Sequence, residues 1–254
     1  MDGERIKVIL GLVGPTPNGK DVIFDTNMSV ARYVSLIIAV VEAVFFIVSV
    51  SGLGAPIADE SMRIAYDFAY ACMIVFSVML FVVSGMYRRG FFRSRVVPRC
   101  ALYLFMVGSA AFGVFVSAID LIQGEQILVF LVMMVICLCL FILPPAVSIP
   151  FSIIAFGAFD IIAYACGGTF SDAMKVNYTS AFIALMVAAV LRYRAAAIMV
   201  KNAEEARAAA MHDVDTGLSN RVALMNDRRG FLGTSLVLFI CDLDDFKYFN
   251  SAYG

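Results

Sequence analysis

The chain has 254 residues, of which 62% are hydrophobic and only 15% are charged, and its mean hydropathy is +0.90. A soluble globular domain carries roughly 45–50% apolar and about 25% charged residues, so this composition excludes an ordinary soluble domain. The formal net charge of −1 argues against a nucleic-acid partner, because proteins that bind nucleic acids carry a basic patch or stripe. The charges also divide the chain: 14 of the 39 charged residues fall in residues 201–254, which indicates a long membrane part followed by a short soluble tail.

The membrane part is predicted to be an all-α bundle of six helices. Residues 1–30 are interpreted as a cytoplasmic N-terminal segment, because they lack the basic stretch of a cleaved signal peptide. Residues 31–198 are interpreted as a six-helix transmembrane sensor domain, because six apolar runs approach the ~20 residues that cross a bilayer. These runs cover residues 34–53, 64–87, 101–122, 126–143, 147–166 and 179–198.

Lysine and arginine residues are unequally distributed between the two sides of the predicted bundle. Thirteen fall on the side that carries both termini, and only Arg63 and Lys175 fall on the other. Positively charged loops remain in the cytoplasm. The sequence therefore predicts a multi-pass protein of the inner membrane with both termini in the cytoplasm.

Four acidic residues fall inside the predicted spans or close to their ends. Glu42 lies near the midplane of the first span and Asp160 within the fifth, whereas Asp67 and Asp120 lie near helix ends. A carboxyl group in hydrocarbon costs about 2.5–3.5 kcal/mol on insertion scales and usually marks a functional site. One interpretation is a cation, proton or amine site, with Glu42 and Asp160 as candidate sensor carboxylates. The other is structural: Asp67 and Asp120 cap helices, while Glu42 and Asp160 are protonated and bond to Ser or Tyr.

A long helix is expected to connect the membrane part to the tail. Residues 179–211 contain no Gly or Pro, so the sixth span can continue without a break. Residues 199–211 are interpreted as a signalling helix linker, in which small side chains follow a three-four spacing. This spacing favours a parallel contact between two copies, and hence a homodimer, with an exposed single helix as the alternative.

The tail contains two polar groups separated by a helix-compatible stretch. The first runs from His212 to Arg221, and the second begins with Asp242 after an apolar run at residues 235–241. A continuous apolar run of this length fits a strand buried on both faces. Carboxylates after such a strand suggest a Mg²⁺ ion that carries phosphates. By itself, however, an Asp-x-Asp-Asp string also fits a sugar-nucleotide transferase or a solvated acidic turn.

Two strings together, D-x-D-T-G-L-x-N-R and D-L-D-x-F-K-x-x-N, resemble the opening of the GGDEF family, the diguanylate cyclases. The resemblance covers residues 212–254 and implies the N-terminal part of an α/β domain of the nucleotide-cyclase type. It implies that Asp242 binds Mg²⁺, with two ions in the complete domain. The residues implied to contact the substrate GTP are Asp245, Phe246, Lys247 and Asn250. The residues implied to join the signalling helix to the domain are Asp213, Thr216, Gly217, Leu218, Asn220 and Arg221.

Two positions depart from the family's pattern, since Asp215 replaces the usual Leu and Ser251 the usual Asp. The chain also ends at Gly254, before the G-G-D/E-E-F hairpin that supplies the second metal carboxylate. The 254-residue chain is therefore expected to be inactive, and its full-length form to make cyclic di-GMP from two GTP. One alternative is a non-catalytic membrane receptor whose degenerate GGDEF segment regulates a partner or a following phosphodiesterase domain. Another is a small transporter that uses Glu42 and Asp160.

Overall fold

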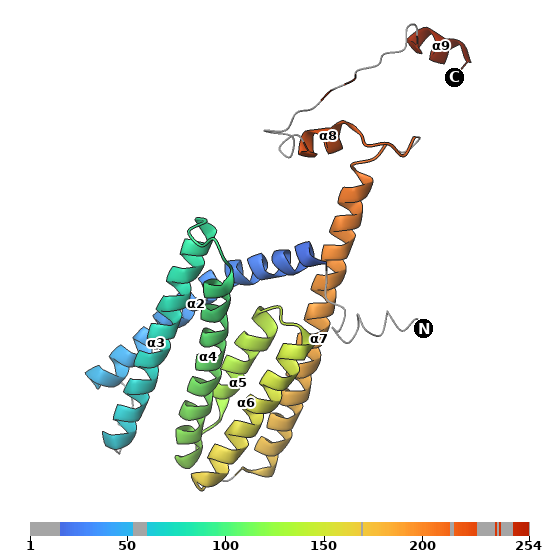
Figure 1. The fold of residues 1–254 in the computed structure, drawn as a ribbon. Coiled ribbons are helices and arrows are strands. Elements are labelled where there is room, and N and C mark those ends of the chain that lie inside the picture. The colour runs from blue at the N-terminus through green and yellow to red at the C-terminus, as the bar shows by residue number, and fades with distance from the viewer. Residues whose placement is uncertain are drawn as a thin grey trace. The chain divides into compact units, whose positions relative to one another are not determined.

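The structure is a computed structural model that describes residues 16–52, 60–168, 170–213, 216–227, 237, 239 and 246–253. The chain divides into two compact units, residues 1–201 and 202–254, and each is described by itself. The helices of the first unit (Figure 1) are α2 (Pro17–Ser51), α3 (Glu60–Arg88), α4 (Val96–Ile122), α5 (Leu128–Val135), the π-helix η1 (Ile136–Leu140), α6 (Pro145–Ala165) and α7 (Asp172–Ala209). The last turns of α7 belong to the second unit, together with α8 (Arg221–Asp227) and α9 (Phe246–Tyr253).

Five helices of the described residues are long and apolar enough to cross a membrane: α2, α3, α4, α6 and α7. Each coincides with a predicted span. The remaining predicted span, residues 126–143, forms only the shorter apolar helix Leu128–Leu140, in which eight α-helical residues are followed by five π-helical residues. At ~1.5 Å per residue this helix rises about 20 Å, less than the ~30 Å hydrocarbon core of a bilayer. The structure thus supports five spans and does not confirm the sixth.

Large apolar side chains cover the outer faces of these helices. Phe68 of α3 is 68% exposed, and Ile154 and Ile161 of α6 are 69% and 71% exposed. Soluble monomers rarely expose apolar patches of this kind. The exposed side chains therefore agree with a multi-pass membrane protein whose outer faces contact lipid.

Helix α2 begins at Pro17, well before the predicted start of the first span at residue 34. Thr16 caps its N-terminus, since the Thr16 hydroxyl oxygen accepts a hydrogen bond from the Gly19 N–H at 3.1 Å. Buried side chains recur every three or four residues along the helix, at Ile23, Phe24, Asn27, Met28, Ala31, Val34, Ser35, Ile38 and Glu42. This stripe packs against α3. Tertiary packing therefore extends the helix through residues that are too polar to belong to a span.

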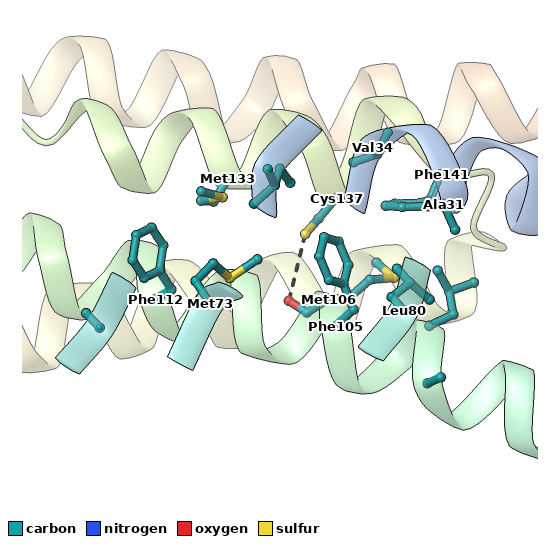
Figure 2. Close-up of a cluster of buried hydrophobic side chains, with 14 of the residues drawn as sticks. Ala31, Val34, Met73, Leu80, Phe105, Met106, Phe112, Met133, Cys137 and Phe141 are labelled. Atoms are coloured by element: carbon teal, nitrogen blue, oxygen red, sulfur yellow. Dashed lines mark hydrogen bonds between the residues drawn. The ribbon is translucent and has the colours of Figure 1, made fainter. Parts of the chain in front are cut away.

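Helix α4 lies between α3 on one side and α5 and α6 on the other (Figure 1). Figure 2 shows Met133 and Cys137 facing α4, where the Cys137 sulfur lies 3.8 Å from the Met106 carbonyl oxygen. The helices approach so closely that a Cβ added at Gly113 would lie 3.0 Å from the Phe130 Cα. Glycine at this position allows the close packing of α4 on α5.

Aromatic rings join α5, α6 and α7 in a second core. The ring of Phe130 lies 4.9 Å from that of Phe156 and 4.8 Å from that of Phe159, between centroids. Tyr178 of α7 packs against Phe156 at 5.0 Å, and its hydroxyl donates a hydrogen bond to the Phe156 carbonyl oxygen at 2.7 Å. Because these rings come from three helices, the contacts hold α5, α6 and α7 together.

The described residues contain no strand, only one isolated antiparallel bridge between His212 and Ser219. The predicted strand at residues 235–241 lies outside the described residues except at positions 237 and 239. The α/β character of the tail therefore stays a prediction.

Candidate functional site

Acidic side chains from three helices gather where α3 begins and α4 ends, which we call the carboxylate end of the bundle. The strongest contact joins α3 to α4: the Tyr66 hydroxyl donates a hydrogen bond of 2.6 Å to Asp120 Oδ1. Tyr66 is buried, and a hydrogen bond to a carboxylate is stronger than one between neutral groups. Asp120 is thus held by a tyrosine of the neighbouring helix, and it is not the simple helix cap of the structural interpretation.

Glu42 of α2 belongs to the same group. Its side chain is only 3% exposed, and its Oε2 atom has no hydrogen-bond partner among the described residues. The Tyr70 hydroxyl is within electrostatic range of the carboxyl groups of Glu42, Asp67 and Asp120. Asp67 Oδ1 is likewise buried without a partner in the described part of the chain. Carboxyl groups from three helices therefore influence the same tyrosine.

Aromatic rings pack around Tyr70, beside these carboxyl groups. The Tyr70 ring stacks on Phe45 at 6.0 Å and on Tyr66 at 6.2 Å, and lies 6.1 Å from Phe112. Sequence reasoning did not assign Tyr66 and Tyr70 to the site. The sequence did contain a signal for them, because Tyr66 and Tyr70 lie about one helical turn apart on α3, on either side of Asp67.

Asp160, the second candidate sensor carboxylate, is placed elsewhere. It is exposed on α6 and lies close to the Tyr178 hydroxyl of α7. Glu42, in contrast, lies against α3. The structure therefore separates the two residues into different groups and brings Glu42 together with Asp67 and Asp120.

The carboxylate end combines acidic oxygens with aromatic faces. No ion pair joins Glu42, Asp67 or Asp120 to a lysine or arginine in the described ranges. Carboxylates and aromatic rings both attract cations. The buried carboxyl groups can accept a proton, although they do not form a group of three that could hold a metal ion.

In the second unit, the described residues of the predicted signalling element form a compact turn between α7 and α8. The Asp213 carboxylate accepts hydrogen bonds from the Thr216 N–H at 3.0 Å and from the Thr216 hydroxyl at 2.8 Å. The backbone closes the turn, because the Asp213 N–H donates to the Leu218 carbonyl oxygen and the Gly217 N–H to that of Asp213. Gly217 has a φ of 68°, a left-handed conformation that glycine adopts without strain.

Asn220 connects this turn to both helices. Its amide nitrogen donates to the Ala210 carbonyl oxygen at 2.9 Å, directly after the end of α7. Its Oδ1 atom accepts hydrogen bonds from the N–H groups of Val222 and Ala223, at 2.9 and 3.2 Å. Asn220 therefore caps the N-terminus of α8, which begins at Arg221.

The predicted GTP and metal residues are only partly within the described chain. Asp242 and Asp245 lie outside it. Phe246, Lys247 and Asn250 lie in α9, but the structure describes only their backbone and not their side chains. No group of three His, Cys, Asp or Glu side chains able to hold a metal occurs in the described ranges.

Comparison with known proteins finds no matching family model, no similar curated protein and no similar solved structure.

Proposed function

We propose that this protein is a membrane-bound sensor whose helical bundle controls a GGDEF-type diguanylate cyclase domain, which makes cyclic di-GMP from two GTP in the full-length protein. The observation that carries the proposal is the turn between α7 and α8. In it, Asp213, Thr216 and Asn220, which match the family's first motif, make the side-chain hydrogen bonds. A turn bonded to the end of one helix and capping the next is suited to transmit a movement of α7.

The chemistry of the proposed domain comes from the family resemblance. Asp242 would hold Mg²⁺, which neutralises the charge on the phosphates when it is bound. Lys247 would contact the phosphates, and the Asn250 amide would read the guanine edge as both donor and acceptor. Since Asp242 and these side chains lie outside the described residues, their roles stay predictions.

The orientation is also part of the proposal. Arg88, Arg89, Arg93 and Arg95 lie at the end of α3 and in the loop before α4, and Arg192 and Arg194 lie on α7. We place these residues on the cytoplasmic side of the inner membrane by the positive-inside rule, with both termini on that side. This placement requires an even number of spans, so the proposal includes a crossing by the shorter apolar helix Leu128–Leu140. A homodimer through the signalling helix and the GGDEF domains would bring two GTP molecules together.

The test is a GTP turnover assay with Mg²⁺ on the gene product whose reading frame continues past Gly254 through the GGDEF hairpin. The purified protein is expected to form cyclic di-GMP, and Asp242→Ala is expected to abolish product formation. Asp227→Ala, at the end of α8, is the matched control, because it removes a carboxylate that neither motif contains.

Product formation by Asp242→Ala at the wild-type level would refute the metal role of this residue. A protein with an intact reading frame that forms no product, but still binds GTP or a partner, would support the non-catalytic receptor instead.

A further inference from the structure

A polar cavity of about 730 Å³ lies at the opposite end of the bundle, beside the loop that joins α3 to α4. Three arginines, Arg88, Arg93 and Arg95, line it together with Tyr87 and Asp25. Arginine is the residue that most often recognises phosphate, because its planar guanidinium presents a fork of donors. The cavity is therefore a candidate anion site that is built only from residues of the first unit and is separate from the carboxylate end.

Arg95 is held in position by α2 and α3. Its guanidinium forms an ion pair with Asp21, lies 4.0 Å from Asp25 and donates a hydrogen bond to the Tyr87 hydroxyl at 3.1 Å. The Tyr87 hydroxyl in turn donates to Asp25 Oδ1 at 2.5 Å. The hydrogen bond with Tyr87, reinforced by Asp21, raises the pKa of Arg95 above its ordinary value. One wall of the cavity is thus preorganised and permanently charged.

Arg88 and Arg93 carry charge that no described residue neutralises. Both are exposed, and neither forms an ion pair with any residue in the described part of the chain. The two acidic residues near the cavity, Asp21 and Asp25, already face Arg95. Two free guanidinium groups beside a fixed one leave the cavity with a net positive charge.

Exposed apolar side chains lie close in sequence to residues that line the cavity. Phe91 is 70% exposed, and Val96 and Val97 at the start of α4 are 62% and 52% exposed. The cavity lies where α3 and α4, two of the apolar helices, reach their ends. An anionic phospholipid has the matching chemistry, because its phosphate would meet the arginines while its acyl chains follow the apolar side chains.

We propose that the cavity formed by Arg88, Arg93 and Arg95 binds the phosphate of an anionic phospholipid headgroup. The bound lipid would bridge the α3–α4 loop and α2, since Arg95 is fixed by Asp21 of α2. The proposed lipid binding does not depend on the proposed cyclase activity, so either proposal can be refuted without the other.

The test measures the binding of phosphatidylglycerol to the purified chain in detergent by native mass spectrometry, with phosphatidylcholine, a zwitterion of zero net charge, as the comparison. Wild-type protein is expected to retain phosphatidylglycerol in preference to phosphatidylcholine. Arg88→Gln and Arg93→Gln are each expected to weaken retention roughly tenfold, the effect of one lost charge-assisted hydrogen bond. Arg93 lies in the loop, so its replacement leaves the helix packing intact.

Arg89→Gln is the matched control, because Arg89 is adjacent to Arg88 and exposed but does not line the cavity. Retention by Arg89→Gln together with loss in Arg93→Gln supports the site. Equal retention by wild type and both cavity variants overturns it, and so does equal loss in Arg89→Gln, which would indicate a mere effect of net charge. Adding inorganic phosphate or GTP tests whether the ligand is a lipid phosphate or a soluble phosphate. Displacement of the lipid by a low concentration of either competitor would assign the cavity to a soluble phosphate and overturn the lipid assignment.

Discussion

Asn27 of α2 and Ile142, 115 positions later in the chain, exchange two hydrogen bonds. Asn27 Nδ2 donates to the Ile142 carbonyl oxygen at 2.9 Å, and the Ile142 N–H donates to Asn27 Oδ1 at 2.8 Å. Ile142 lies where η1 has ended and before Pro144 and Pro145, so its backbone groups have no helical partner. An amide side chain suits this position, because it is both a donor and an acceptor.

Replacing this amide is expected to destabilise the bundle. Asn27→Ala leaves the N–H and the C=O of Ile142 without their partner in a partly buried environment, which should lower the free energy of unfolding by roughly 1–3 kcal/mol. Chemical denaturation in detergent measures the change. Asn18→Ala, at an exposed position of the same helix, should change stability by less than about 0.5 kcal/mol. Equal losses in the two variants would show that the bonds to Ile142 contribute nothing.

The bond between Tyr66 and Asp120 is expected to stabilise the packing of α3 on α4. Tyr66→Phe keeps the ring that stacks on Tyr70 and removes only the hydroxyl, so we expect a loss of about 1.5–3 kcal/mol in unfolding free energy. Adding Asp120→Asn to this variant should cost little more, because the partner is already absent. Tyr164→Phe, whose side chain is 87% exposed, is the control. Strict additivity of the two substitutions would contradict the coupling.

Replacing the carboxyl group of Glu42 by an amide is expected to change the stability of the protein differently from the same replacement at Asp120. Its Oε2 atom is buried without a described partner, so Glu42→Gln keeps the shape, removes a group that is costly to ionise in hydrocarbon, and should not lower stability. Asp120→Asn, in the same group of carboxyls, should lower it because the Tyr66 hydroxyl loses a charged acceptor. Thermal unfolding in detergent compares the two. A clear loss of stability in Glu42→Gln would indicate an ionised carboxylate bound to a cation.

The turn between α7 and α8 is expected to depend on Asn220. Asn220→Ala removes the cap of α8, which is typically worth about 1 kcal/mol, so the amides of Val222 and Ala223 should exchange several-fold faster with deuterium. Hydrogen-exchange mass spectrometry of the membrane-embedded protein measures this rate. Ser219→Ala is the control, since it leaves both bonds of the cap unchanged. Unaltered exchange in Asn220→Ala would exclude the capping role.

Several features were predictable because they depend on neighbouring residues in the sequence. Hydropathy located the five long apolar helices among the six spans it predicted. The absence of Gly and Pro from residues 179–211 predicted an unbroken helix, and α7 continues to Ala209. A carboxyl group inside an apolar run is equally a local signal, and Glu42 was identified by it. The order of Asp213, Thr216 and Asn220 matched a family motif that joins a helix to a domain, but the turn that these residues form was not predicted from the sequence.

Other features depended on contacts between residues far apart in the chain. The early start of α2 at Pro17 results from packing on α3, and the short helix Leu128–Leu140 ends where Asn27 satisfies the Ile142 backbone. By itself the sequence determined which segments are apolar and which polar residues follow α7, because those are properties of adjacent side chains. Only the tertiary structure decided that Glu42 joins Asp120 rather than Asp160, since the packing order of the helices determines which buried carboxyls meet.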